Sequence, residues 1–208
     1  MAGKINRDFF FKQIRSSLLG GAIKQSQVDG LTALLDHWES TYATSDDRWL
    51  AYILSTAFHE TAHTLQPIKE FGGDAYFTKM YDIDGARPRL AKSLGNITPG
   101  DGKKYPGRGF VQITGKANYA SWTKRLNLPG VDLVATPDKA MDLKIATIII
   151  FQGMILGTFT GKKLSNSFTS ATEDWTGARS IVNPGDKALM IADYARKFYG
   201  SISYTTGA

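Results

Sequence analysis

The chain of 208 residues contains no cysteine, so disulfide bonds contribute nothing to its stability, and it can fold in a reducing cytoplasm. Histidine is nearly as scarce, with three residues in all. A catalytic zinc ion takes three protein ligands, usually drawn from histidine, cysteine and carboxylates. The missing cysteines therefore exclude a disulfide-stabilised fold, and the few histidines leave few candidate ligands for a zinc site.

No apolar run is long enough to cross a bilayer, which takes about 20 residues. The most apolar stretch, residues 145–156, is interrupted by Gln152 and Gly153, and we expect a buried core helix there. A signal peptide is also missing, because Lys12 and Arg15 closely follow the phenylalanines at the N-terminus. We therefore expect cytoplasmic synthesis without an export signal and no integral membrane association.

Composition and charge are those of a globular protein with a basic surface. The apolar fraction is 42% and the charged fraction 21%, and this length supports one domain with a substantial core. The formal net charge of +6 favours anionic partners such as the bacterial wall. The basic residues are scattered, without the aromatic-basic pattern of nucleic-acid-binding proteins. We therefore expect no nucleic-acid partner. We also expect the protein to be a monomer.

Apolar residues recur at helical spacing along most of the chain. Thr44 followed by Asp47 resembles a capping box at the start of one helix, and Pro67 sets its end near Gln66. Glycine, proline and aspartate are frequent over residues 71–109, which predicts a loop-rich segment with one short helix. The fold class predicted is mainly α, with little or no β-structure and with helices over 5–20, 27–40, 44–66, 87–94, 115–126, 138–157 and 185–199.

Residues 59–63 read His-Glu-Thr-Ala-His, which matches the H-E-x-x-H pattern of zinc peptidases. In those enzymes two histidines one helical turn apart bind zinc, and the glutamate is the general base. The third histidine, His37, belongs to another predicted helix. Glu70 or Asp74 follows too closely to lie on a neighbouring helix as the third ligand. We therefore expect no metal and no other cofactor, with the zinc peptidase as an alternative.

A second interpretation makes Glu60 a proton donor. Glu60 falls on the apolar side of its predicted helix with Ile53 and Ala57, and it lies in the last turns. Burial and the negative end of the helix dipole both disfavour a carboxylate, so we expect the pKa of Glu60 to be raised. A carboxyl group that stays protonated near neutral pH is suited to general acid catalysis. The alternative is a structural glutamate bonded to backbone or to His63.

Hydrolysis of a glycoside by the two-acid route needs a second carboxylate. Inverting enzymes hold the two carboxyl groups roughly 6.5–9.5 Å apart, which leaves room for a water molecule. Glu70 follows the break at Pro67 and is our candidate base, with Asp74 as its alternative.

A third patch lies around Arg108, where two flanking glycines allow backbone to approach a ligand closely. Phe110, Gln112 and Thr114 alternate along the next residues, which suggests a short extended piece with a polar face. Its amide and hydroxyl groups are suited to holding a water molecule or a sugar acetamido group.

These motifs, in this order, resemble those of the family 19 glycoside hydrolases, chitinase-like enzymes that include bacteriophage endolysins. The family's His-Glu-Thr corresponds to residues 59–61, and its Tyr-Tyr-Gly-Arg-Gly-x-x-Gln-Leu-Ser/Thr segment to residues 105–114. Its following Asn-Tyr corresponds to residues 118–119, and its Arg-x-Ile-Asn stretch resembles residues 178–183. The resemblance covers the chain from about residue 5 to residue 200.

The resemblance implies that Glu60 is the general acid, that Glu70 is the base, and that Thr114 with Gln112 places the attacking water. It implies a sugar-binding role for His59, Tyr105, Arg108, Asn118 and Asn183. The implied fold is lysozyme-like and mainly α, with a cleft between a larger helical lobe and a smaller loop-rich lobe around residues 71–109. We expect both lobes to form a single catalytic domain over residues 1–208, without a separate cell-wall-binding module.

The chain departs from the family pattern at several positions. Pro106 replaces the second tyrosine, Gly115 stands where an aromatic residue often follows, and Tyr194 occupies the place of an arginine in the C-terminal helix of the plant enzymes. The plant enzymes also separate their two glutamates by considerably more than ten residues. Glu70 follows Glu60 by only ten, so its assignment as the base is the part of the resemblance that fits the family least. They are secreted and disulfide-bonded, so the missing cysteines here favour the phage branch.

We therefore predict a bacteriophage endolysin that hydrolyses the β-1,4 glycosidic bonds of peptidoglycan, with inversion, as a muramidase. Made in the host cytoplasm, it would need a holin or another membrane lesion to reach the wall. The alternatives are a chitinase, a lytic transglycosylase, an H-E-x-x-H zinc peptidase and a wall-binding protein without enzymatic activity.

Overall fold

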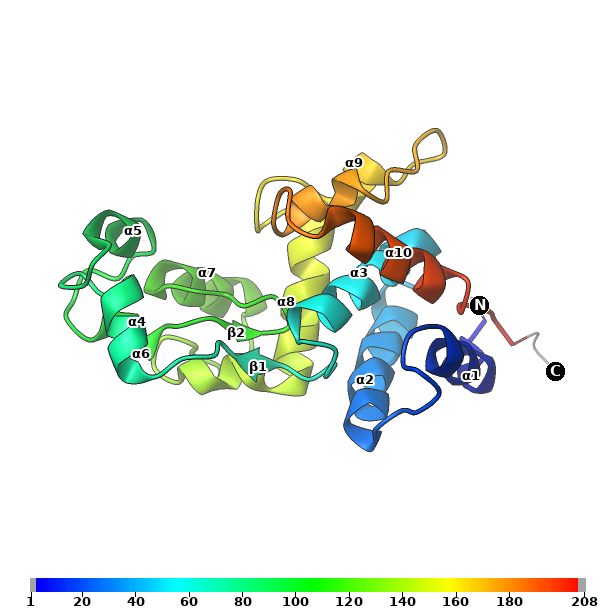
Figure 1. Ribbon diagram of the computed structural model, residues 1–208, viewed down its shortest axis with the longest axis horizontal. Coiled ribbons are helices and arrows are strands. Elements are labelled where there is room, and N and C mark those ends of the chain that lie inside the picture. Colours follow the sequence, from blue (N-terminus) through cyan, green and yellow to red (C-terminus); the bar gives the residue numbers. More distant parts are fainter. Residues whose placement is uncertain (1–2, 206–208) are drawn as a thin grey trace. The chain divides into compact units, whose positions relative to one another are not determined.

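Helices make up nearly all the regular structure in residues 3–205, the part of the chain that the computed structural model describes (Figure 1). These described residues form ten α-helices, two 3-10 helices and two strands of two residues each. The predicted mainly α class with little β-structure is confirmed. Within the described residues, no helix combines the length and the apolar character needed to span a membrane.

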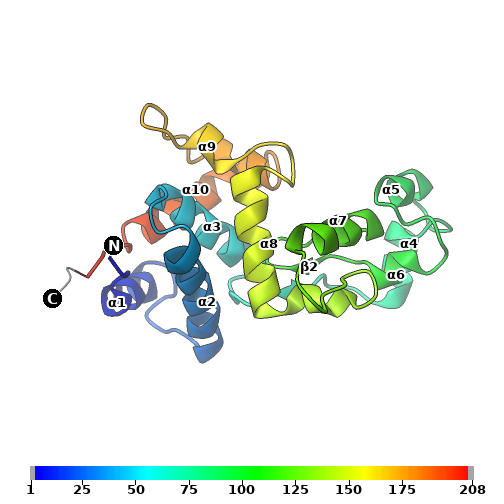
Figure 2. The same ribbon diagram turned by 180° about the vertical axis from the view of Figure 1, so that it is seen from behind.

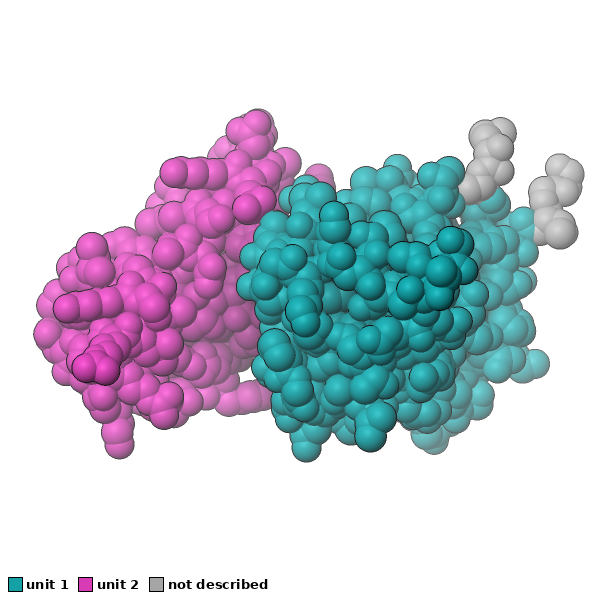
Figure 3. All heavy atoms as spheres, turned by 90° about the horizontal axis from the view of Figure 1, so that it is seen from above, with its two compact units in different colours: residues 1–66, 150–208 teal, residues 67–149 magenta. Residues whose placement is uncertain are grey.

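The chain divides into two compact units, coloured separately in Figure 3. Unit 1 comprises residues 1–66 and 150–208, and unit 2 comprises residues 67–149. The division falls within helix α8 (Leu143–Leu156). The loop-rich segment expected over residues 71–109 lies inside unit 2.

Unit 1 is built on the pairing of α3 (Asp47–Glu60) with α10 (Ala188–Tyr199), which lie against each other in Figures 1 and 2. The apolar side chains at helical spacing in α3 are fully buried, and so are those in α2 (Gln25–Thr41). These side chains are Leu50, Ile53, Leu54 and Ala57 in α3, and Leu31, Leu34, Leu35 and Trp38 in α2. The unit also contains the second part of α8 together with α1 (Arg7–Ser17), α9 (Leu164–Ser167) and the 3-10 helix η2 (Gly177–Ile181).

Both ends of α3 differ from the prediction. The residue that caps its start is Asp46, not Thr44, and the Asp46 carboxylate accepts the Arg48 backbone N–H at 2.9 Å. The predicted end near Gln66 is also wrong, because α3 ends at Glu60. Thr61 stops the helix: its hydroxyl donates to the Ala57 carbonyl at 2.7 Å and accepts the Leu65 N–H at 2.9 Å. Left-handed backbone follows at residues 62 and 63, so the chain leaves the helix six residues earlier than Pro67 required.

The turn that follows Glu60 packs closely against α2 at Gly30. A Cβ atom at Gly30 would overlap the carbonyl oxygen of Leu65. We expect Gly30→Ala to lower the free energy of unfolding by about 2 kcal/mol, because the overlap outweighs the better helix propensity of alanine. Urea denaturation measures this change. Gly200→Ala is the matched control, since a Cβ there meets only ordinary contacts, and a Gly30→Ala variant as stable as this control would contradict the packing argument.

Unit 2 contains the small sheet, in which β1 (Ile68–Lys69) pairs antiparallel with β2 (Arg108–Gly109). The short helix predicted over 87–94 is present as α5 (Pro88–Ser93), and the helix predicted over 115–126 is present as α7 (Lys116–Leu126). Two short helices were not predicted, and they pack on each other: α4 (Asp74–Tyr81) and α6 (Asp101–Lys104).

The helix predicted over 138–157 is divided in two. The 3-10 helix η1 (Pro137–Met141) ends before Asp142, and α8 begins immediately after it. The Asp142 carboxylate accepts the Ile145 N–H at 3.1 Å. This bond satisfies one of the free N–H groups at the start of α8, which explains the break.

Candidate functional site

Glu60 is the last residue of α3, and its side chain is 19% exposed. The guanidinium of Arg179, on η2, donates to Glu60 Oε1 at 2.6 Å. Arg179 is itself 2% exposed, and its Nε donates to the Asp186 carbonyl at 2.9 Å. Glu60 is therefore held at the helix end by a buried arginine that is anchored from its other side.

The ion pair is a contact that the sequence alone did not indicate. It places the positive charge of the Arg179 guanidinium directly beside the Glu60 carboxyl group. The partner lies 119 residues away in sequence, so no local pattern indicated it. The guanidinium beside Glu60 comes from η2, and not from the C-terminal helix α10.

The two histidines of the H-E-x-x-H motif are separated by the end of α3. His59 lies within the helix, whereas His63 follows it with a left-handed φ of 68°. The His63 ring stacks on Phe58 with 4.1 Å between ring centroids, and its Nε2 lies 3.4 Å from the Tyr194 hydroxyl. The zinc arrangement requires both imidazoles on one helical face, and this backbone does not provide it. Among the described residues, no group of three or more histidine, cysteine or acidic side chains is placed to hold a metal.

His59 is partly buried, and burial lowers the pKa of its imidazole. The ring is therefore neutral near neutral pH, when it can donate one hydrogen bond and accept another. Asn183, also predicted to contact sugar, is exposed just after η2, and its N–H donates to the Arg179 carbonyl at 3.0 Å. Both residues thus belong to unit 1 with Glu60 and Arg179.

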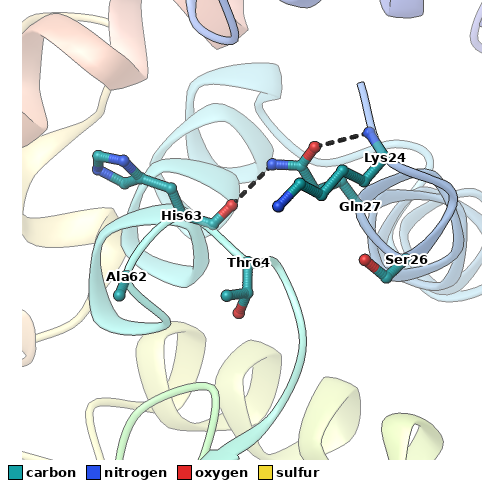
Figure 4. A pocket seen from close by; sticks show the side chains of 6 residues that line it. All are labelled: Lys24, Ser26, Gln27, Ala62, His63 and Thr64. Carbon is teal, nitrogen blue, oxygen red and sulfur yellow. Dashed lines mark hydrogen bonds between the residues drawn. The ribbon is translucent and has the colours of Figure 1, made fainter. Parts of the chain in front are cut away.

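A pocket of about 230 Å³ adjoins the turn after Glu60 (Figure 4). The side chain of Gln27 bonds to residues on either side of this pocket. Its amide Nε2 donates to the His63 carbonyl at 2.9 Å, and its Oε1 accepts the Lys24 N–H at 2.9 Å. These bonds tie the turn to the start of α2. The pocket is lined by Lys24, Ser26, Gln27, Ala62, His63 and Thr64.

In unit 2, Glu70 directly follows β1, and both of its carboxylate oxygens accept hydrogen bonds. The Tyr81 hydroxyl donates to Oε1 at 2.8 Å, and the Gly107 N–H donates to Oε2 at 3.1 Å. Burial, followed by the bond to Glu70, raises the pKa of Tyr81, so the phenol remains a donor. Tyr81 was missed by sequence reasoning, since it ends a helix that was not predicted. Asp74, the alternative base, is the exposed first residue of that helix.

Gln112 and Thr114 lie beside the backbone that binds Glu70. A Cβ at Gly107 would lie 2.8 Å from Gln112 Oε1 and 3.2 Å from Thr114 Oγ1. The glycine therefore lets both polar side chains approach this backbone closely. The extended conformation predicted for residues 110–114 is wrong. Gln112 has a left-handed φ of 53°, and the chain folds back there so that Ile113 pairs with Arg108.

The side-chain amide of Gln112 stabilises this fold, since Nε2 donates to the carbonyls of Ile68 at 2.9 Å and Gly109 at 3.0 Å. The Thr114 hydroxyl donates to the Gln112 carbonyl at 3.0 Å. Asn118, exposed in the first turn of α7, donates to the Thr114 carbonyl at 2.6 Å. Three of the predicted site residues are thus joined directly to one another.

Arg108 and Tyr105 have their polar groups inside unit 2. Arg108 is 5% exposed and donates to Asp138 at 2.8 Å and to the Tyr119 hydroxyl at 2.9 Å. Burial raises the pKa of Tyr119 to about 12. Tyr105 is buried and donates to the Val134 carbonyl at 3.1 Å. Both side chains hold the loop that carries Gly107, and their contact with sugar stays a prediction.

No protein-family model and no curated protein sequence matches this chain, but solved structures do. Chitinase C from Streptomyces griseus HUT6037 superposes with a TM-score of 0.57 at 17% identity, covering 99% of this chain and 80% of that one. A glutamine-for-glutamate mutant of chitinase C gives 0.56 at 16% identity, with the same coverage. A bacterial family 19 chitinase gives 0.48 at 19% identity, covering 97% of this chain and 96% of that one. The chain thus shares the overall fold of chitinase C, and the predicted lysozyme-like, mainly helical fold is confirmed.

Proposed function

We propose that this protein is a glycoside hydrolase that cleaves β-1,4 bonds between N-acetylated sugars with inversion. The proposal rests on two carboxylates whose positions are fixed by hydrogen bonds. Glu60 accepts one from the buried Arg179, and Glu70 accepts one from Tyr81 and one from a backbone N–H. The fold shared with chitinase C supports the same reaction class. The two units together form one catalytic domain in this proposal, which acts as a monomer without a cofactor.

Glu60 is the general acid. Arg179 occupies Oε1 of its carboxyl group, which leaves Oε2 to carry the proton. That proton passes to the glycosidic oxygen as the bond from the sugar's anomeric carbon to this oxygen breaks, and the leaving sugar departs as an alcohol. The anchored guanidinium also stabilises the carboxylate that forms when the proton has left.

Glu70 is the general base. It takes a proton from a water molecule whose oxygen attacks the anomeric carbon from the opposite face of the ring. Tyr81 and the Gly107 N–H orient the carboxylate by bonding one oxygen each. Thr114 and Gln112, which lie close to Gly107, position the water, and Asn118, Asn183 and His59 contact sugar.

Arg179 tests the acid assignment through its effect on the rate. We expect Arg179→Met to lower kcat roughly 10- to 100-fold, as expected for lost stabilisation of developing charge. Arg179→Lys, which retains the positive charge, should lose less activity than Arg179→Met. Full activity in a folded Met variant would contradict a role for Arg179 beside the acid.

We propose peptidoglycan as the substrate and a bacteriophage endolysin as the biological role. The net charge of +6 supports attraction to the anionic bacterial envelope. The cysteine-free chain is suited to folding in a reducing host cytoplasm, from which a holin lesion would release it. Chitinase is the second candidate, and the shared fold with chitinase C favours it.

Digestion of purified peptidoglycan and of chitin hexamer, followed by mass spectrometry and anomer analysis, tests the proposal. We expect soluble muropeptides with hydrated reducing ends that are initially α-anomers, and little cleavage of chitin. Cleavage of chitin alone would establish the chitinase instead, and 1,6-anhydro ends would identify a lytic transglycosylase. Peptide-bond cleavage abolished by a chelator would establish a zinc peptidase, and binding without release would exclude an enzyme.

A further inference from the structure

The positive charge of the chain is concentrated in unit 2. Residues 67–149 contain thirteen lysines and arginines against eight aspartates and glutamates, a net charge of +5. The residues of unit 1 contain twelve against eleven, a net charge of +1. An interaction driven by charge would therefore involve unit 2.

Six exposed basic side chains gather on the part of unit 2 that contains α4, α5 and α6. We name this set the basic surface, and it consists of Lys79, Arg87, Arg89, Lys92, Lys103 and Lys104. Among the described residues, none of the six takes part in a salt bridge. Their charges are thus available to a partner.

The buried carboxylate of Asp82 connects the end of α4 to the start of α6. Asp82 Oδ2 accepts the backbone N–H groups of Gly100 at 2.8 Å and Gly102 at 3.0 Å, at the start of α6. The Ala86 N–H donates to the Lys79 carbonyl at 2.8 Å, which brings the start of α5 to the end of α4. The basic side chains belong to these three helices or to residues next to them, and the helices lie close together in Figures 1 and 2.

Two of the acidic side chains near the basic surface are buried, so they present little negative charge to a partner. Asp82 is 1% exposed and Asp101 is 6% exposed, and both bind backbone N–H groups. Asp101 also pairs with Lys116 at 3.3 Å. Asp74 and Asp84 are the exposed acids of this part of unit 2, and they stand against six basic residues.

An apolar side chain projects among these charges. Ile97, in the loop between α5 and α6, is 67% exposed. The loop is held in place, because the Thr98 N–H donates to Asp101 at 3.1 Å and the Asn96 side chain donates to the Tyr81 carbonyl at 2.9 Å. The structure therefore presents an aliphatic side chain at a defined position in the loop between two of the helices that carry the basic surface.

We propose that the basic surface docks unit 2 onto an anionic phospholipid bilayer. Lysine and arginine meet the lipid phosphates, and Ile97 enters the boundary between headgroups and acyl chains. An aliphatic side chain fits a bilayer better than nucleic acid, where aromatic side chains stack on bases. The inference does not rest on the proposed reaction, since it uses neither Glu60 nor Glu70.

The test is sedimentation of the full chain with phosphatidylglycerol–phosphatidylcholine vesicles at low salt. Arg89→Glu/Lys92→Glu is compared with Lys12→Glu/Arg15→Glu, which reverses two exposed basic residues at the same helical spacing in α1. We expect the first pair to weaken binding roughly 30-fold or more, from the loss of two surface cations, and the second to change it less than about threefold. Ile97→Ser should weaken binding several-fold without changing its salt dependence. Pure phosphatidylcholine vesicles should not bind.

Equal losses in the two charge-reversed pairs would overturn the proposal, because net charge alone would then explain binding. So would unaltered binding of Arg89→Glu/Lys92→Glu, or no binding of the wild type. Tighter binding to duplex DNA than to vesicles through the same residues would replace the bilayer with nucleic acid. Full competition by soluble polyphosphate with no effect of Ile97→Ser would reduce the surface to a phosphate site and overturn bilayer docking. Glu60→Gln should bind vesicles like the wild type, which separates this result from failure of the enzymatic proposal.

Discussion

Glu60→Gln is expected to lower kcat for peptidoglycan hydrolysis by roughly 10³-fold, because glutamine has no acidic proton to donate to the leaving sugar oxygen. The amide oxygen of glutamine can still accept the Arg179 hydrogen bond, so the helix end should keep its geometry. Release of soluble muropeptides measures the loss. A second measurement uses a substrate with a dinitrophenyl leaving group, which departs without protonation and should be cleaved with a much smaller loss.

Glu39→Gln is the matched control for this experiment. Glu39 is also a glutamate of unit 1 paired with an arginine, since Arg7 lies 3.0 Å from its carboxylate, and its side chain is 17% exposed. We expect this variant to lose some stability and to keep its activity. Glu60→Gln with more than a tenth of wild-type activity would refute the acid assignment. An equal loss on both leaving groups would point to a role other than proton donation.

Glu70→Gln is expected to reduce hydrolysis by about 10²- to 10⁴-fold, because the attacking water loses its proton acceptor. Added azide needs no deprotonation, so it should restore bond cleavage and give the α-glycosyl azide, as attack from the face opposite a β-linked leaving group requires. Mass spectrometry and NMR identify that product. The glutamine oxygen can accept the Gly107 N–H while its amide NH2 donates to the Tyr81 hydroxyl oxygen, which should preserve the local fold.

Asp74→Asn distinguishes the two candidate bases. Asp74 is exposed at the start of α4, and we expect its replacement to leave hydrolysis within about twofold of the wild type, as for most surface substitutions. A severe loss in Asp74→Asn, combined with an active Glu70→Gln, would transfer the base role to Asp74. Activity retained in both variants would contradict a two-carboxylate mechanism.

Helical periodicity predicted most of the long helices, because an apolar stripe at a spacing of 3.6 residues is a local property of the chain. The buried stripes of α2 and α3 confirm this. The end of α3 was misplaced because Pro67 restricts only the residue before it, whereas the stop depends on bonds made by the Thr61 hydroxyl. The short helices α4 and α6 were missed because glycine-rich flanks obscured them and Asp82, which stabilises α6, acts from a distance.

The residue order established the fold class, the basic character of the chain and the two candidate carboxylates, since each depends on side-chain type and short-range spacing. Tertiary packing alone brought Arg179 to Glu60 across 119 positions and joined Tyr81 and the Gly107 N–H to Glu70. Packing also brought together α4, α5 and α6, which carry the basic surface. The physical reason is that a hydrogen bond or ion pair acts over a few ångströms in space, whatever the number of residues between its partners.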